Sequence, residues 1–275
     1  MTKKNAVATA ASNLPANIMG DMVQAAGAGR AQHAEDMAIP FLVILQTGSP
    51  QVKRGQPEYI KEAESSNIMN SVTKELFDGE EGITVIPCAF EKVFIEWKDR
   101  EKGGGIVMVH DRVRGAELET KAKRNDKGQA VLDNGNIIVG TAQHYVLILR
   151  KDGTVDQALI AMSSTQLKKS RQWNTIMAKV MIAVGDKKVP APSFACKYQL
   201  TTVAESNAKG DWFGWKIEHL GGKEPAFLQD TERPLFQMAK AFYEAIMGGA
   251  VKVSDRVDEH AAPAGVSSEK ASKVM

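Results

Sequence analysis

Three aromatic residues lie within four positions of one another in the segment GDWFGWKIEH, residues 210–219. If this segment is a β-strand, Phe213, Trp215 and Ile217 share one face, and Trp212 and Lys216 share the other. The first set is typical of a core face, so we expect Trp212 and Lys216 to be displayed. An exposed aromatic ring can stack on a nucleic-acid base while a nearby cation neutralises phosphate. The alternative is that all of these aromatics belong to the core.

The segment EKVFIEWK, residues 91–98, shows a similar alternation. Val93, Ile95 and Trp97 share one strand face, and Lys92, Phe94, Glu96 and Lys98 share the other. If the first set faces the core, Phe94 is an exposed aromatic among lysines, as in a base-stacking platform. If the strand is covered on both sides, Phe94 is part of the core. The sequence leaves both interpretations open.

Positive charge is concentrated in residues 164–190, which contain six basic residues and one acidic residue, Asp186. On a helical period, four of the basic side chains flank an apolar stripe, and they are Lys168, Lys169, Arg171 and Lys179. These side chains could contact phosphates. A solvated helix face is the alternative interpretation.

One enzymatic alternative follows from Glu96 and Lys98, which project from the same strand face with Asp78 upstream. Metal-dependent nucleases use such carboxylates to hold Mg²⁺ and a lysine to position water. Glu-x-Lys is common by chance, and an ion pair on a solvated strand face is the simpler explanation. The five histidines are scattered without metal-site spacing, and Gly103–Gly105 lacks the spacing of a phosphate loop. We therefore expect no catalytic residue, metal or cofactor.

The elements that would position these residues are short strands separated by Gly, Asn and Asp turns. Two helices are predicted, over residues 163–184 and 231–249, and the second has Leu235, Phe236, Ala239, Phe242 and Ile246 as its buried stripe. Strands are predicted at residues 39–46, 83–90, 91–97, 106–110, 136–150 and 157–162. This pattern predicts an α+β fold, mainly antiparallel β, built as an OB-like barrel or small sandwich with two helices.

Composition sets the boundaries of the domain. Residues 1–37 are predicted to be a mobile arm with a short helix near residues 18–26, residues 38–250 one β-rich domain, and residues 251–275 a flexible tail. A net charge of +2 means that any basic surface must be local. Two distant cysteines, no signal peptide and no apolar run of about 20 residues favour a soluble cytoplasmic protein.

Four strings, taken together and in this order, resemble the single-stranded DNA-binding proteins that bacteriophages encode in their replication modules. The resemblance spans about residues 38–250, and the strings are IPFLVILQTGSPQV, FIEWKDREKGGG, AMSSTQLKKSRQWN and YQLTTVAESNAKGDWFGWKI. It implies an OB-like barrel that protects single strands during replication and recombination without catalysis. The positions that match the family's aromatic and basic residues are Phe94, Lys98, Arg100, Trp212 and Lys216.

The tail departs from this family, in which many members end in an acidic segment that recruits replication proteins. Residues 251–275 carry four basic and four acidic residues. Whether the tail binds replication proteins is therefore open, as is the oligomeric state. A further alternative is a phage factor that binds no DNA and docks on a host enzyme through its helices and tails.

Overall fold

The computed structural model describes residues 19–25, 28–29, 39–99, 103–208 and 210–249. The chain divides into residues 1–37 and residues 38–275, which are described separately. In the first part, the predicted short helix is present as α1, Met19–Gln24. The predicted mobile arm and the predicted tail otherwise lie outside the described residues.

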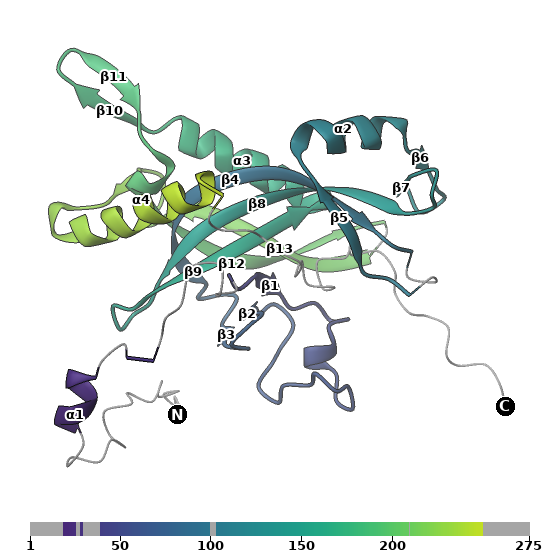
Figure 1. Cartoon of the computed structure of the whole chain (residues 1–275), viewed down its shortest axis with the longest axis horizontal. Helices are drawn as coiled ribbons and strands as arrows, with labels where there is room; N and C mark the ends of the chain where they lie inside the picture. The colour runs from purple at the N-terminus through teal and green to yellow at the C-terminus, as the bar shows by residue number, and fades with distance from the viewer. Residues whose placement is uncertain (1–18, 26–27, 30–38, 100–102, 209, 250–275) are drawn as a thin grey trace. The chain divides into compact units, whose positions relative to one another are not determined.

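A long antiparallel pair of strands forms the centre of residues 38–275 (Figure 1). It pairs β4, Ile83–Trp97, with β8, Ile137–Leu149, along almost their whole length. The sequence predicts two strands at residues 83–90 and 91–97, but the structure has one continuous strand. A register shift between Pro87 and Ala89 accommodates the proline, which cannot donate a ladder hydrogen bond.

The remaining strands extend this pair to a nine-stranded sheet. Six of the nine strands follow one another in the order β13-β12-β4-β8-β7-β6. Three further strands pair off this path, β9 with β8, β5 with β4 and β14 with β12. The bounds are β5 Ile106–His110, β6 Lys123–Arg124, β7 Ala130–Val131, β9 Val155–Ser163, β12 Cys196–Asn207, β13 Gly210–His219 and β14 Ala226–Phe227.

Residues 40–46 contact two edge strands of the curled sheet, β9 and β13. At the β9 edge, the Leu159 amide donates to the Pro40 carbonyl at 2.9 Å. At the β13 edge, the Gln46 side chain accepts from the Phe213 amide at 2.8 Å and donates to the Phe213 carbonyl at 3.0 Å. These bonds connect the two edges through a small three-stranded sheet of β1 Leu42–Ile44, β2 Ile68–Asn70 and β3 Leu76–Phe77.

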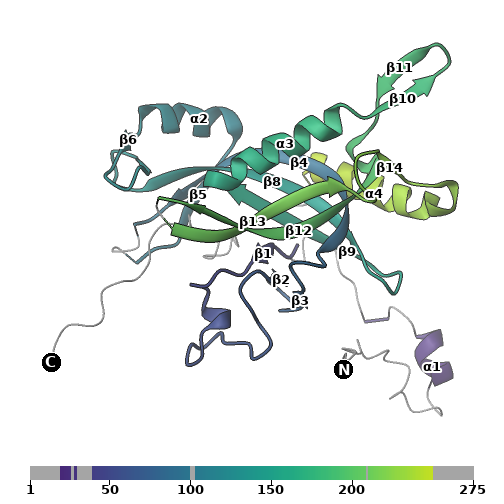
Figure 2. The same ribbon diagram turned by 180° about the vertical axis from the view of Figure 1, so that it is seen from behind.

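Each face of the sheet has its own apolar core. One core packs Trp173 of α3, Leu167–Ala178, against residues such as Val146, Tyr198 and Trp215. The other packs α4, Arg233–Met247, against residues such as Tyr145 and Leu147. Figures 1 and 2 show that α2, Arg112–Lys121, lies on the same side of the sheet as α3. The short 3₁₀ helices are Pro50–Val52, Ser164–Gln166, Ser193–Ala195 and Asp230–Glu232.

The predicted fold class is confirmed, because the chain is α+β with mainly antiparallel strands in a curled, OB-like sheet. The predicted helix 231–249 is confirmed as α4, whose stripe residues Ala239, Phe242 and Ile246 are buried. The predicted helix 163–184 is too long, because α3 ends at Ala178. Residues 181–190 instead form a hairpin of β10, Met181–Val184, and β11, Lys187–Pro190. Its alternation of β-branched residues around the Gly185–Asp186 turn favours strands over helix.

None of the helices in the described part of the chain combines the length and the apolar character needed to cross a bilayer. The cytoplasmic location stays a prediction. Cys88 and Cys196 are both buried and free, and they belong to the cores on opposite faces of the sheet. Burial raises the pKa of the Cys88 thiol to about 12, so this thiol stays protonated at neutral pH.

Candidate nucleic-acid interface

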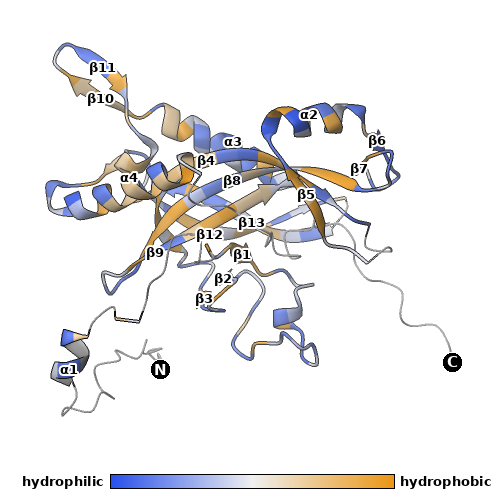
Figure 3. Cartoon of the chain, viewed as in Figure 1, coloured by the Kyte–Doolittle hydropathy of each residue, from blue (hydrophilic) through white to orange (hydrophobic). Residues whose placement is uncertain are grey.

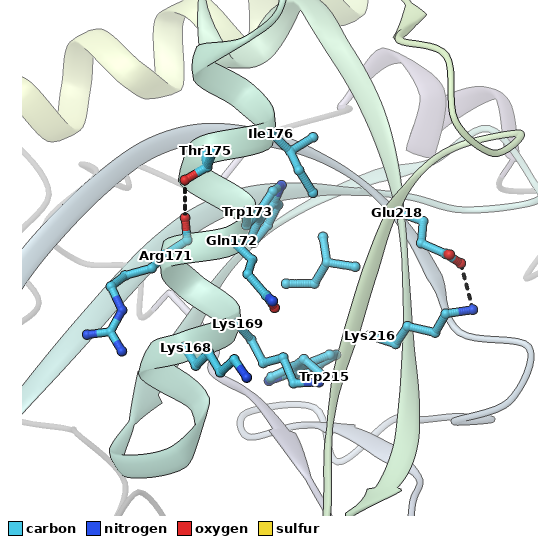
Figure 4. A pocket seen from close by; sticks show the side chains of 11 residues that line it. Lys168, Lys169, Arg171, Gln172, Trp173, Thr175, Ile176, Trp215, Lys216 and Glu218 are labelled. Atoms are coloured by element: carbon cyan, nitrogen blue, oxygen red, sulfur yellow. Dashed lines mark hydrogen bonds and ion pairs between the residues drawn. The ribbon is translucent and has the colours of Figure 1, made fainter.

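A groove of about 570 Å³ runs between α3 and the edge strand β13 (Figure 4). Lys168, Lys169 and Arg171 line the α3 side, and Trp215, Lys216 and Ile217 line the β13 side. The fold therefore brings four predicted site residues, from segments about 50 positions apart, to one groove. A second cavity of about 480 Å³ shares Ile176, Ile217 and Glu218 with the groove and adds two cations, Lys179 and Lys223.

The cations of these cavities differ in how they are paired. Lys169 contacts Glu205 at 2.7 Å, and Lys216 contacts Glu218 at 2.8 Å. Figure 4 shows that Lys216 points away from α3, toward Glu218. Within the described ranges, the side chains of Lys168, Arg171, Lys179 and Lys223 make no ion pair or hydrogen bond. These four cations are available to an external anion.

Glu205 of β12 fixes the end of the groove nearest the start of α3. Its carboxylate accepts from the Trp212 indole N–H at 2.9 Å and from the Gln166 amide at 3.2 Å, in addition to Lys169. Burial by itself would raise the pKa of Glu205, but the hydrogen bonds from Lys169, Trp212 and Gln166 outweigh burial and lower it. Glu205 therefore stays ionised and holds these side chains in place. No local pattern around Glu205 in the sequence indicates this role.

Trp212 and Trp215 keep the faces that strand alternation predicts for them. Trp215 is 3% exposed and belongs to the core beside Trp173, as predicted. Trp212 is only partly buried, so part of its ring reaches the surface. Lys216 is exposed, also as predicted. The Trp215 amide donates to the Gln166 side chain at 3.0 Å, which positions the start of α3 against the edge of β13.

The predicted exposure of Phe94 is wrong, because this ring is 5% exposed. Helix α2 covers it so closely that a Cβ at Gly115 would overlap the Phe94 ring. The predicted alternative, a strand covered on both sides, is what the structure has here. No helix is predicted where α2 lies, because its residues, RVRGAELETK, carry only a weak apolar pattern. A usable signal was Asp111, which caps the helix by accepting from the Val113 and Arg114 amides.

Lys92 lies on the same face of β4 as Phe94 and is half buried, with its ammonium 5.4 Å from the Phe94 ring centroid. Burial lowers the pKa of Lys92, Glu119 raises it, and Arg171 and Arg112 lower it further. Arg112 and Arg171 are therefore close enough to Lys92 to repel its charge. Lys92 itself is not among the residues that line the groove.

Two other predicted residues lie elsewhere. Lys98 is exposed beyond the end of β4, where its amide donates to the Gly105 carbonyl at 2.9 Å. It follows Lys92 by six residues, which corresponds to about 20 Å along a strand. Arg100 lies outside the described residues. The structure does not bring Lys98 to the groove.

The nuclease alternative has no assembled site in the described ranges. Asp78 and Glu96 flank opposite ends of the long strand β4, and Asp78 accepts from the Glu80 and Glu81 amides in a turn. Glu96 is 7% exposed and accepts from Asn134, Asn136 and His110. In this part of the chain, no three His, Cys, Asp or Glu side chains are grouped so that they could hold a metal ion.

Comparison with known proteins gives one family. The family model described as Pam3 phage gp34-like protein matches residues 6–252. No curated protein and no solved structure matches the chain.

Proposed function

The chain belongs to the Pam3 phage gp34-like family, and for this member we propose sequence-tolerant, non-catalytic binding of single-stranded DNA in phage DNA replication or recombination. The strand lies along the basic groove between α3 and β13. The four unpaired cations of the two cavities neutralise phosphates, while Lys169 stays paired with Glu205. Bases stack on the exposed part of the Trp212 ring.

The observation that carries this proposal is the set of unpaired cations in the groove between α3 and the edge strand β13 and in the cavity next to it. Lys168 and Arg171 from α3, Lys179 just after it and Lys223 after β13 have no ion-pair partner in the described ranges. A chain with a net charge of only +2 gathers these cations on one surface. Such a stripe suits a polyanion whose charges repeat along its length.

The curled, OB-like sheet also supports the proposal. Barrels of this kind bind oligonucleotides and oligosaccharides on an open face between loops. This chain adds a helix beside the edge of the sheet, so that the groove has one helical wall and one strand wall. The surface offers cations and few directional acceptors, which favours backbone contacts over base-specific readout.

Titration of the protein with oligo-dT across a salt series tests the proposal. Trp173 and Trp215 line the groove, so binding is expected to change tryptophan emission. Neutralising four phosphates predicts a slope of about −3 for log K against log[salt] on a single strand. Lys168→Ala combined with Arg171→Ala is expected to reduce this slope by about 1.4. The matched control is Lys151→Ala, an exposed lysine on the turn between β8 and β9. No binding at low salt would contradict the proposal.

A second candidate function is docking on another protein, and exposed apolar residues favour it. The β10–β11 hairpin exposes Met181, Ile182, Val184 and Val189 by between 36% and 59%. Strand β5 exposes Val107, Met108 and Val109, and Figure 3 shows the hydrophobic colour of β5 beside the mainly hydrophilic α2. If docking were the only function, the protein would bind a partner and show no affinity for oligo-dT.

We also propose that residues 251–275 recruit replication proteins. These residues lie outside the described ones. Removing residues 251–275 is expected to leave oligo-dT affinity unchanged, because the described residues that line the two cavities all lie between Lys168 and Pro225.

A further inference from the structure

Phe90 is an exposed aromatic residue on the strand face that carries Lys92. Its side chain is 38% exposed. Among the described Phe, Tyr and Trp residues, only Tyr243 is also exposed, and Tyr243 lies on α4, which packs against the other face of the sheet. Phe90, Lys92 and Phe94 alternate along β4, so they point to the same side. The ring displayed beside Lys92 is therefore Phe90, and α2 covers Phe94 instead.

An aromatic layer beneath Phe90 holds its ring in place. The His144 ring lies 4.9 Å from the Phe90 ring, and His144 in turn stacks on Trp173 at 4.6 Å with an interplanar angle of 22°. The His144 Nε2 atom and the Ser170 hydroxyl are 2.8 Å apart, which fixes this layer to α3. A base that stacks on Phe90 would therefore meet a pre-oriented surface, and pre-orientation reduces the entropy lost on binding.

Three cations lie on the same side of the sheet as this ring, and Lys92 is two residues from it along β4. Lys92 occupies space that Gly140 leaves open, because a Cβ at Gly140 would lie 2.9 Å from the Lys92 ammonium. Arg112 begins α2, and Arg171 lies on α3. In the described residues none of the three cations forms an ion pair, and Glu119 is the one carboxylate close enough to act on Lys92. Like charges held this close favour binding of an anion between them.

We propose that Phe90, Lys92, Arg112 and Arg171 form one nucleotide-binding subsite on the side of α3 that faces α2. The base stacks on Phe90, and its phosphate lies among Lys92, Arg112 and Arg171. This inference rests on the proposed single-stranded DNA binding and assigns it a second contact region. Since Arg171 also lines the basic groove, the strand passes over the first half of α3 between the two regions.

The base contact is tested with Phe90→Leu and with two probes of equal length, oligo-dT and an abasic oligomer. Phe90→Leu is expected to weaken oligo-dT binding about 5- to 150-fold, the range that stacking of one base on an aromatic ring supplies. Binding of the abasic oligomer is expected to stay unchanged, since the phosphate contacts remain. The matched control is Tyr243→Leu, with the same exposed fraction on the other face of the sheet.

The phosphate contact is tested with Arg112→Ala against Arg114→Ala. Arg114 lies on the same helix but pairs with Glu117 at 3.4 Å. Arg112→Ala is expected to weaken binding of both probes and to reduce the salt slope by about 0.7, and Arg114→Ala to change neither. If Phe90→Leu disturbs folding, Phe90→Trp retains a ring and is expected to bind oligo-dT at least as tightly as the parent protein, with quenched emission.

The outcomes separate this inference from the proposed function. If the parent protein binds oligo-dT and Phe90→Leu binds it equally tightly, the subsite is refuted while single-stranded DNA binding stands. If the parent protein binds neither probe, single-stranded DNA binding is refuted, and the subsite with it.

Discussion

Phe90 and Phe94 lie four residues apart on the same face of β4 and have opposite environments. Phe90 is 38% exposed and Phe94 is 5% exposed. The difference comes from α2, whose Gly115 lets the helix backbone approach the Phe94 ring. Residue type and strand spacing do not predict which of the two rings is exposed, because both are phenylalanines on one strand face. At the scale of single residues, function here depends on which neighbour covers a ring.

Two tryptophans on β13 allow a direct comparison at this scale. Trp215→Ala is expected to lower the free energy of unfolding by about 3–5 kcal/mol, because it removes a fully buried ring. Trp212→Ala should cost less, since this ring is only partly buried. We expect it to weaken oligo-dT binding while the fold is retained. Urea unfolding and oligo-dT titration measure the two effects, and equal destabilisation by both substitutions would contradict the assignment.

His144 predicts a pH dependence of stability. Burial lowers its pKa from 6.5 to about 3, so between these values the unfolded chain binds a proton that the folded chain does not. Stability is therefore complete above about pH 7 and falls as the pH decreases, by about 2 kcal/mol between pH 7 and 5. His144→Phe keeps an aromatic ring and is expected to flatten this dependence.

The measurement is urea unfolding at pH 7, 6 and 5 for the parent protein and for His144→Phe. Burial also lowers the pKa of His219, which contributes to the slope in both proteins. The difference between the two curves therefore reports on His144 alone. Parallel curves would show that His144 accepts a proton in the folded state.

At the scale of elements, α2 and α3 determine what the sheet displays. Helix α3 fills one side of the curled sheet with Trp173 and presents Lys168 and Arg171 outward. Helix α2 buries Phe94 together with Ile138 and Ala130. Both helices lie on the same side of the sheet, and each supplies one arginine whose charge acts on Lys92 of β4, namely Arg112 and Arg171.

Gly115→Ala tests the contact between α2 and the sheet. The added methyl group would overlap the Phe94 ring, and we expect a loss of about 1–3 kcal/mol despite the better helix propensity of alanine. Displacement of α2 should also weaken oligo-dT binding by moving Arg112. The control is Gly48→Ala, where no atom lies within 4 Å of an added Cβ. Thermal unfolding of both variants gives the comparison, and equal midpoints would contradict the close packing.

At the scale of the whole domain, residues 40–46 complete the curled sheet. They contact β9 through Pro40 and β13 through Gln46, two edges that are far apart in sequence. Gln46 supplies both a donor and an acceptor to the backbone of Phe213, as another strand would. A side chain here takes the place of a missing ladder hydrogen-bond pair.

Gln46→Leu is expected to lower the free energy of unfolding by about 1–3 kcal/mol, because the Phe213 amide and carbonyl lose their partners. Hydrogen exchange should show faster exchange at the Phe213 amide than at amides in the centre of β8. Gln157→Leu replaces an exposed glutamine on β9 and serves as the control. Unchanged protection of the Phe213 amide would mean that the two edges are held together by other contacts.

Strand and helix types followed from local patterns in the sequence. The apolar segments of β8 and β9, the apolar stripe of α4 and the Gly- and Asn-rich turns are each patterns of a few residues, and the structure confirms the elements that they predict. Strand alternation also separated Trp215 from Trp212 correctly. The end of α3 and the presence of α2 could not be read in this way, since α2 is held mainly by its contact with Phe94 and its cap at Asp111.

The sequence by itself determined the antiparallel, mainly β class, the buried face of β13 and the basic character of α3, because each depends on periodicity within one segment. Only the tertiary structure decided that Lys168 and Arg171 border Trp215 across a groove, that Phe94 is covered and that Phe90 is exposed. The physical reason is that exposure and charge proximity are properties of packing between segments. They depend on which elements the chain brings together, and no local pattern encodes that.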